Sequence, residues 1–458
     1  MEKEAFSHLA LGNIRKNRPE ISGRDLVFLT RLCEGTLERC LTLDYVLNRY
    51  SKTPVIKMKP IIRNLLRLSA YQILYMDSVP DSAACNEAVK LAKARGFAGL
   101  SGFVNGVLRR IAREKERIPW PDEDEGTYGL SVRYSMPEWI VDGWLSRYGR
   151  DSVKVMLEAA LSDRPVTVRV QEGKAPGRDR EEKRRNVAAS LAGEGIRALP
   201  AAYYPGALYL TSPDSLSRTR AMEKGWITVQ DESSMLALLS AFLALPSGKE
   251  KRLARDVCAA PGGKALFLAD LFGPDGEVFC CDISEAKCAK IRENQKRCGG
   301  ENLSTFLWDA RETDTSWIEK ADIVIADLPC SGLGIMGKKN DIRYKASREG
   351  CLSLAALQRE MLSAAFSYVK PGGILLYSTC TICPEENEEN RAYILKDSTF
   401  EPVPLTDLLA GRLSDTKEAE DLLKEKTLKE GYLQLLPGLH ACDGFFFSVF
   451  RKKSRKDA

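Results

Sequence analysis

The chain has 458 residues, of which 44% are hydrophobic and 29% are charged, and its net charge at pH 7 is +5. This length and composition are typical of a soluble protein with several globular domains, and they exclude collagen-like, low-complexity and wholly disordered chains. The two histidines and 13 cysteines disfavour His-rich metal sites, Ser-His or Cys-His hydrolases and a disulfide scaffold.

Residues 1–117 predict an all-α domain. Apolar residues recur at helical spacing, as in Leu26, Leu29, Cys33 and Leu37, and few Gly or Pro residues interrupt them. The first 120 residues carry 21 Lys or Arg and 12 Asp or Glu, so their net charge is +9, while the rest of the chain sums to −4. A basic end on a near-neutral body favours a polyanionic partner such as nucleic acid, although a solvated helical surface is the alternative.

The next two stretches differ in composition from the first domain. Residues 118–131 are rich in proline and acidic residues, and we interpret them as a linker. Residues 132–230 mix helical and strand patterns, with a helix expected at about 137–161 and a short strand at Val166–Val170. They predict a small α+β middle segment.

From Leu253 onward, strand and helix patterns alternate along the chain. Short apolar runs separated by helical stretches are typical of a parallel sheet with helices on both faces. Residues 231–452 therefore predict an α/β Rossmann-like domain, and a basic tail follows at 453–458. The expected strands are Leu253–Val257, Val278–Cys281, Leu303–Leu307, Ile323–Ala326 and Ile374–Tyr377, with two late strands near Tyr432–Leu436 and Gly444–Phe450.

Glycine and acidic residues follow the expected strands at the carboxyl edge of the sheet, where such folds bind ligands. The first strand leads into a small-residue loop that can approach a ligand closely, and the helix after it presents free N–H groups. Asp282 ends the second strand, where an acid can accept hydrogen bonds from both ribose hydroxyls, and Asp309 and Asp327 end the next two. The loop consists of Cys258, Ala259, Ala260, Pro261, Gly262, Gly263 and Lys264.

These features favour a nucleoside-bearing cofactor. The loop does not fit the frame Gly-x-x-x-x-Gly-Lys-[Ser/Thr], which disfavours an NTPase. S-adenosylmethionine (SAM) has no pyrophosphate, so the single glycine pair fits SAM better than NAD.

Cys330 and Cys380 follow the fourth and fifth expected strands, beside the predicted cofactor site. A free cysteine is usually a packing residue, but two on adjacent loops next to Asp327 favour a chemical role. A thiolate that adds to C6 of cytosine makes C5 nucleophilic enough to take a methyl group, and a carboxyl group near N3 can stabilise the adduct. This chemistry requires no histidine.

These motifs closely resemble those of the NOL/Nop/Sun family of RNA cytosine-C5 methyltransferases. The N-terminal segments 86–93 and 103–110 are similar to the transcription antitermination factor NusB, so the first domain is expected to be NusB-like. The combination resembles the bacterial Sun-type members of the family. It implies SAM-dependent methylation of C5 of a specific cytosine in small-subunit (16S) rRNA, through a covalent Cys–C6 adduct. The resemblance is carried by residues 256–264, 327–331 and 378–387, with flanking segments 230–234 and 443–446.

The resemblance also implies a role for each candidate site residue. Cys380 is implied as the nucleophile, Cys330 as the thiol that helps to release product, and Asp327 as the acid between the cofactor and cytosine N3. Asp282 would bind the ribose and Asp309 the adenine amino edge. DNA cytosine-C5 enzymes instead attack with the Pro-Cys thiol, which here is Cys330.

The chain departs from the family pattern at several positions. Leu328 stands where alanine is common, and the stretch 338–341 replaces a His-Pro-Asp-like segment, which puts an RNA contact there in doubt. Lys264 faces either the cofactor or the nucleophile loop. Cys383 creates a Cys-x-x-Cys pair with Cys380, but no second pair completes a zinc site, and we expect no metal.

Partners follow from charge and from the NusB resemblance. Arg109, Arg110 and Arg113 lie within about one helical turn, so they can contact phosphates or complement the negative end of a helix. Arg169, within a short strand, is a further candidate for phosphate contact. No run approaches the ~20 apolar residues of a membrane span, and the start carries no secretory signal.

We therefore expect a cytoplasmic monomer that binds small-subunit rRNA and no membrane. The alternatives are the same chemistry on tRNA and a non-catalytic RNA-binding module.

Overall fold

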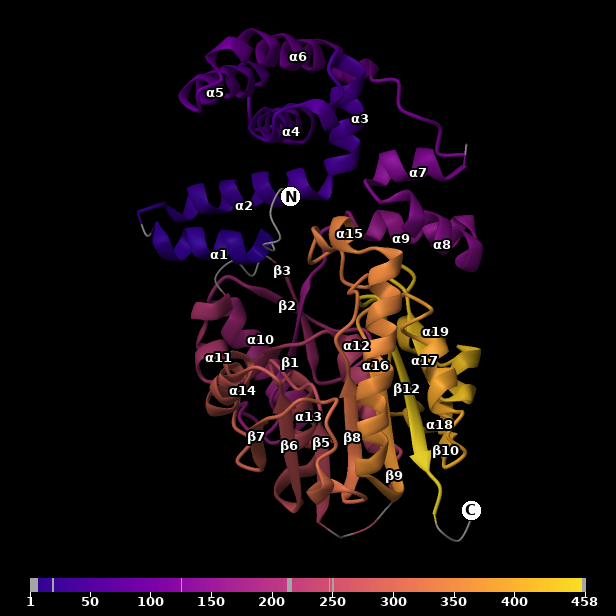
Figure 1. The fold of residues 1–458 in the computed structure, drawn as a ribbon. Helices are drawn as coiled ribbons and strands as arrows, with labels where there is room; N and C mark the ends of the chain where they lie inside the picture. The colour runs from indigo at the N-terminus through magenta and orange to yellow at the C-terminus, as the bar shows by residue number, and fades with distance from the viewer. Residues whose placement is uncertain are drawn as a thin grey trace. The chain divides into compact units, whose positions relative to one another are not determined.

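The computed structural model describes residues 7–18, 20–124, 126–211, 216–246, 248 and 251–454. The chain divides into two compact units, one of residues 1–162 with 336–345 and one of residues 163–335 with 346–458 (Figure 1). No helix within the described ranges is long and apolar enough to cross a membrane.

The first unit is a helical assembly, as the apolar spacing of its sequence predicts. Leu43, Leu47 and Leu66 are fully buried at its centre, where they pack with Tyr71. This confirms the all-α prediction for the N-terminal domain. Its helices are α1 (Ser7–Asn17), α2 (Gly23–Glu38), α3 (Cys40–Tyr50), α4 (Pro60–Tyr75), α5 (Asp81–Ala94), α6 (Ser101–Glu114), α7 (Gly126–Tyr134), α8 (Glu138–Tyr148), α9 (Arg150–Ala159) and α15 (Ile342–Lys345).

Two features of this unit differ from the sequence expectation. The single helix expected at about 137–161 is two helices, α8 and α9. Gly149 separates them with a φ of +73°, which residues with a side chain rarely adopt. Helix α7 begins within the stretch 118–131 that the sequence predicts as a linker.

The middle segment is a small antiparallel sheet with two helices, in the order βαββαβ. The strands lie in the order β2-β3-β1-β4 and all their pairs are antiparallel, which is the ferredoxin-like arrangement. Val168 and Leu208 of the sheet pack against Val187 and Leu191 of α10. The α+β prediction is therefore confirmed. The elements are β1 (Val166–Val170), α10 (Arg180–Gly193), β2 (Arg197–Pro200), β3 (Ala207–Thr211), α11 (Arg220–Glu223) and β4 (Ile227–Val229).

The rest of the second unit is built on an eight-stranded sheet in the order β10-β12-β9-β8-β5-β6-β7, with β11 beside β12. Strands β5 to β9 are parallel, and every pair that includes β12 is antiparallel. The predicted Rossmann-like domain is confirmed, although β9 begins earlier than expected, at Val369. The strands are β5 (Arg252–Asp256), β6 (Gly276–Asp282), β7 (Leu303–Leu307), β8 (Ala321–Asp327), β9 (Val369–Thr379), β10 (Phe400–Pro402), β11 (Tyr432–Leu435) and β12 (Phe445–Lys452).

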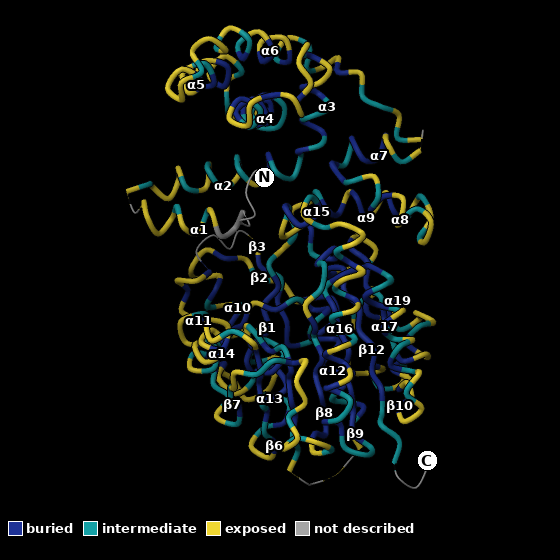
Figure 2. The backbone as a smooth tube through the Cα atoms, in the orientation of Figure 1, coloured by how far each residue is buried: buried dark blue, intermediate teal, exposed yellow. Residues whose placement is uncertain are grey.

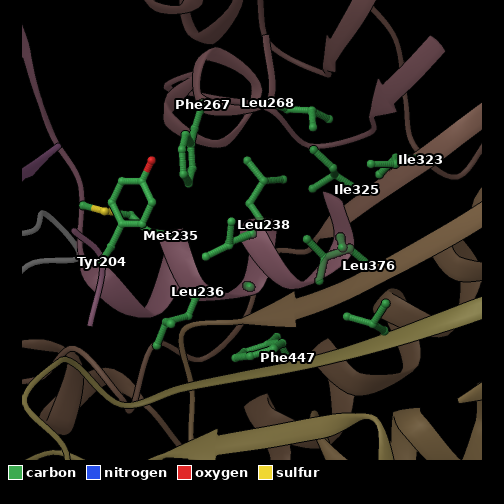
Figure 3. Close-up of a cluster of buried hydrophobic side chains, with 14 of the residues drawn as sticks. Tyr204, Met235, Leu236, Leu238, Phe267, Leu268, Ile323, Ile325, Leu376 and Phe447 are labelled. Carbon is green, nitrogen blue, oxygen red and sulfur yellow. The ribbon is translucent and has the colours of Figure 1, made fainter. Parts of the chain in front are cut away.

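Helices cover both faces of this sheet, because alternate residues of each central strand point to opposite sides. Ile323 and Ile325 of β8 belong to the buried cluster that includes residues of α12 and α13 (Figure 3). Val324, between them, packs with Leu362 and Tyr368 of α16. The helices are α12 (Glu232–Leu243), α13 (Gly263–Phe272), α14 (Glu285–Cys298), α16 (Arg348–Tyr368), α17 (Glu388–Ile394), α18 (Thr406–Leu409) and α19 (Lys417–Leu422).

The strand order positions a ligand site. The chain adds β6 and β7 on one side of β5 and then crosses to the other side to form β8 and β9. The loops after β5 and β8 therefore leave the sheet edge in opposite directions, and such switch points are where open α/β sheets bind ligands. Figure 2 shows that the central strands below this edge are buried.

Candidate active site

The loop after β5 turns directly into the N-terminus of α13. Gly262 makes this turn with a φ of +99°, and a Cβ atom there would lie 3.3 Å from the side chain of Ile291. Asp256 ends β5 and is buried, and one of its carboxylate oxygens accepts a hydrogen bond from the N–H of Cys258 at 3.3 Å. The sequence therefore places a glycine where both the backbone conformation and the packing favour one.

The two acids expected to bind the nucleoside have different surroundings. Asp282, at the end of β6, is buried and accepts a 3.4 Å hydrogen bond from the N–H of Ala260, so it borders the β5 loop. Its carboxylate also lies 3.3 Å from Nζ of Lys287. Asp309, after β7, is held by the guanidinium of Arg311 at 2.6 Å, and these hydrogen bonds lower the pKa of the Asp309 carboxyl.

Asp327 joins the cofactor loop to the nucleophile strand. Nζ of Lys264 lies 2.7 Å from one carboxylate oxygen of Asp327, and Oγ of Ser378 donates to the other oxygen at 2.7 Å. Lys264 thus contacts Asp327, the acid that lies between the predicted cofactor site and the nucleophile loop. The buried carboxyl of Asp256 is a close neighbour of Asp327. Burial and the negative charge of Asp327 raise the pKa of Asp256 to about 7.

The structure brings the two strand-end cysteines together. Asp327 and Ser378 are paired in the register of β8 and β9, so the loops that follow the two strands leave the sheet side by side. The Sγ atoms of Cys330 and Cys380 lie 3.2 Å apart, and no disulfide joins them. The Cys380 thiol, followed by burial, raises the pKa of Cys330 well above its ordinary value.

A buried hydrogen-bond network fixes the two loops that carry these thiols. Glu386 is fully buried and accepts from the N–H of Ser331 at 2.9 Å and from Nε2 of Gln358 at 3.0 Å. Asn387 donates to the carbonyl of Thr381 at 3.0 Å. The sequence places Glu386 and Asn387 in the family motif 378–387 and indicates no role for either residue. Glu386 lies seven residues after Thr379, the end of β9, and no local pattern in the sequence indicates that the chain turns back there toward the neighbouring loop.

Arg169 is a correction to the sequence interpretation. Its side chain is fully buried, and Nη1 lies 2.9 Å from a carboxylate oxygen of Asp270. Nε donates to Gln230 at 2.9 Å, and the guanidinium lies over the ring of Phe267. The guanidinium is thus engaged within the second unit, where it is not accessible to a phosphate.

Arg109, Arg110 and Arg113 remain candidates for RNA contact, and we call them the α6 arginines. All three are exposed on α6. Arg110 pairs with Glu114 at 3.4 Å and lies over the ring of Tyr50. They form an exposed basic stripe near the end of the helix.

Comparison with known proteins matches all three parts of the chain to family models. Residues 243–451 match the 16S rRNA methyltransferase RsmB/F model, residues 1–113 match the NusB family, and residues 136–217 match the ferredoxin-like domain of RsmF/B-like methyltransferases.

Relatives resemble this chain over almost its full length. A probable ribosomal RNA small subunit methyltransferase B of Bacillus subtilis is 36% identical over 458 residues, covering 99% of this chain and 96% of the relative. The ribosomal RNA small subunit methyltransferase B of Escherichia fergusonii is 30% identical and covers 95% of this chain and 92% of its own.

Two solved structures show the same fold. The crystal structure of PH0851 aligns with a TM-score of 0.76 at 24% identity, covering 96% of this chain and 93% of its own. A methyltransferase homolog protein from Pyrococcus horikoshii aligns with a TM-score of 0.56 at 25% identity, covering 70% of this chain and 97% of its own.

Proposed function

Since this chain belongs to the 16S rRNA methyltransferase RsmB/F family, we propose that it transfers the methyl group of SAM to C5 of one cytosine in small-subunit rRNA. The observation that carries this proposal is the pair of thiols 3.2 Å apart, on the two loops that follow the paired strand ends Asp327 and Ser378. This arrangement supplies a nucleophile, a second thiol and a carboxyl group within one edge of the sheet.

We assign the attack on the base to Cys380. Its sulfur forms a bond to C6, and the electron pair of the C5–C6 double bond moves into the ring, where Asp327 beside N3 stabilises the adduct. C5 then accepts the methyl group that SAM supplies. The transfer leaves S-adenosylhomocysteine as the second product. A general base then takes the C5 proton, the electron pair of that C–H bond re-forms the C5–C6 double bond, and the C6–Sγ bond breaks with its electron pair returning to the sulfur of Cys380.

The surroundings of Cys330 support this assignment. The Cys380 thiol and burial raise the pKa of Cys330 well above its ordinary value, which suits Cys330 to a role as a proton donor and not as the nucleophile. A protonated Cys330 next to the departing sulfur can return a proton to it as the adduct collapses. The hydrogen bond from the Ser331 N–H to Glu386 fixes the loop in which Cys330 lies.

SAM fits the residues of the β5 loop. Gly262 and the N-terminus of α13 allow a close approach of the ligand, and the buried carboxylate of Asp282 beside Ala260 suits the ribose hydroxyls. Asp309 would accept a hydrogen bond from the adenine amino group in place of its present ion pair with Arg311. The lining residues are Cys258, Ala259, Ala260, Pro261, Gly262, Gly263, Lys264 and Asp327.

The first unit supplies affinity for RNA in this proposal. Its excess of basic residues and its match to the NusB family support a role in docking rRNA, with the α6 arginines against phosphates. We further propose that the protein acts as a monomer in the cytoplasm, since one chain contains every residue of the candidate site.

Bisulfite mapping of total RNA tests the proposal. RNA from a strain that lacks the gene should lose protection at one cytosine of small-subunit rRNA and should regain it when the wild-type chain is expressed. Loss of protection in a tRNA instead would reassign the substrate and keep the chemistry. Unchanged protection everywhere would leave the chain as an RNA-binding module.

A further inference from the structure

A second group of chemical donors lies next to the candidate active site and supplies no reacting atom to the proposed reaction. It consists of Cys351 in the first turn of α16, and of Cys383 and Glu386 in the loop after β9. The two Sγ atoms and a carboxylate oxygen lie within 4.8 Å of one another. The three residues are 1%, 6% and 0% exposed, so the cluster is enclosed by protein.

Glu386 has one oxygen that the protein does not satisfy. One carboxylate oxygen accepts from the Ser331 N–H at 2.9 Å and from Gln358 at 3.0 Å. The other, Oε1, is buried and has no hydrogen-bond partner among the described residues. Buried polar atoms are nearly always partnered, and an orphaned acceptor calls for a bound water or ion.

We propose that Cys351, Cys383 and Glu386 bind a zinc ion. Two thiolates and a carboxylate are ligands that Zn²⁺ takes in proteins, with Zn–S bonds of about 2.3 Å and Zn–O bonds of about 2.0–2.2 Å. Tetrahedral geometry with these bonds sets the donors roughly 3.5–3.8 Å apart. This separation lies within the 4.8 Å spread of the three donor atoms.

A fourth donor is within reach of the same site. A carboxylate oxygen of Glu385 lies 3.0 Å from Sγ of Cys383, and the thiol now donates to it. When Cys383 binds zinc as a thiolate it loses that proton, and Glu385 becomes available to close the coordination shell. Structural zinc sites in proteins are closed in this way by four protein ligands.

Two alternatives to zinc, a different metal ion and a disulfide, fit the three donor residues less well. Magnesium and calcium prefer oxygen ligands and are disfavoured by the two sulfurs. A disulfide between Cys351 and Cys383 would use both sulfurs but would leave Oε1 of Glu386 without a partner. Zinc would take both sulfurs and one carboxylate oxygen of Glu386 as ligands.

The zinc ion would hold the loop that carries Cys330. The second oxygen of Glu386 binds the N–H of Ser331, the residue after Cys330, so a ligand of the metal also positions the thiol loop. Outer hydrogen bonds of this kind orient metal ligands in proteins. Sequence reasoning missed the site because its second sulfur comes from a helix 32 residues before Cys383.

Cobalt substitution tests the proposal without reference to methyl transfer. Full-length protein, stripped of metal and reduced, should bind one Co²⁺ per chain. It should show a thiolate-to-cobalt charge-transfer band and the d–d bands of a tetrahedral site, and Zn²⁺ should displace both. Cys351→Ser, Cys383→Ser and Glu386→Gln should each lower zinc affinity by more than the about 10–100-fold that the loss of an outer hydrogen bond costs.

Two control variants separate this site from other cysteines. Cys298→Ser removes a buried cysteine of the same unit whose sulfur lies 3.2 Å from Oγ1 of Thr228, and it should keep the cobalt spectrum. The double variant Cys330→Ser/Cys380→Ser removes the other close thiol pair and should keep the spectrum as well. Loss of the spectrum in the double variant alone would place the metal at the catalytic pair and overturn the proposal.

Two further results would also overturn it. One is a wild-type protein that gives no charge-transfer band with Co²⁺. The other is a protein in which oxidised dithiothreitol joins Cys351 to Cys383 while Zn²⁺ neither binds nor protects the two thiols. In that case the pair is a redox pair, and a water satisfies Glu386.

Discussion

The buried carboxyl of Asp256 should make the second unit less stable as the pH rises, and Asp256→Asn should remove that penalty. Asp256 is 1% exposed, and burial together with the Asp327 carboxylate raises its pKa from 3.8 to about 7, against the opposing effect of Lys264. In the unfolded chain the group loses its proton near its ordinary pKa. In the folded state it keeps the proton up to about pH 7.

The sign and size of the effect follow from these two values. Between them the folded state binds more protons than the unfolded state, so the free energy of unfolding falls as the pH rises. A shift of about three units corresponds to an upper limit of about 4 kcal/mol, which is reached above pH 7. Asparagine keeps an oxygen that can accept from the Cys258 N–H.

Urea denaturation at a series of pH values measures this difference. Asp256→Asn and the wild type should unfold at similar urea concentrations near pH 4, and the variant should become the more stable of the two toward pH 8. A variant whose stability runs parallel to that of the wild type over the whole range would refute the reasoning, because Asp256 would then hold no buried proton.

Asp314 provides a control of opposite sign. Burial acts to raise the pKa of its carboxyl, but hydrogen bonds from Ser316 and Arg255 outweigh this effect and lower the pKa. The ionised form of Asp314 therefore adds stability above its unfolded pKa, and this stability is lost as the pH falls. Asp314→Asn should be less stable than the wild type at neutral pH, and the difference should shrink in acid.

Three further predictions concern the cofactor, the core and the RNA. Asp282→Asn should weaken SAM binding by up to about 1.5–3 kcal/mol per ribose hydrogen bond, since a charged acceptor becomes neutral; an unchanged calorimetric affinity would remove Asp282 from the site. Arg169→Met should cost about 3–5 kcal/mol of stability, because Asp270 loses its buried partner, and should leave rRNA affinity unchanged; weaker rRNA binding by a stable variant would restore the phosphate contact. Replacing the α6 arginines with glutamine should weaken rRNA binding and make it less dependent on salt concentration, because fewer counterions are released. If filter binding shows an unchanged salt dependence, the α6 arginines do not contact phosphates and instead complement the negative end of the helix.

The parts of the fold that repeat a local pattern could be predicted from the sequence. Each central strand is a short apolar run, and the run Leu303–Leu307 matches strand β7 residue for residue. The proximity of Cys330 and Cys380 also follows from the sequence, because parallel neighbouring strands end at the same edge. Their 3.2 Å separation depends on the Asp327–Ser378 register, which no local pattern encodes.

The parts that depend on distant partners could not be predicted. An arginine in a strand indicates an exposed edge unless a carboxylate lies opposite it, and the partner of Arg169 is Asp270, 101 residues later. In the same way, the Cys-x-x-Cys spacing groups Cys380 with Cys383, although in the structure Cys380 lies against Cys330 and Cys383 clusters with Cys351. The spacing of two cysteines in the sequence limits how far apart they can lie, but it does not determine which side of the loop each thiol faces.

Trapping the protein on its RNA tests the central claim, that Cys380 attacks the base and Cys330 assists release. Each alanine variant should be incubated with SAM and unmethylated small-subunit rRNA and then separated by denaturing electrophoresis. Cys330→Ala should accumulate a protein–RNA adduct, and Cys380→Ala and the double variant should form none. Thermal melting should show that the variants are folded, since removal of one core thiol costs only about 1 kcal/mol. An adduct in Cys380→Ala and none in Cys330→Ala would contradict the account and make Cys330 the nucleophile.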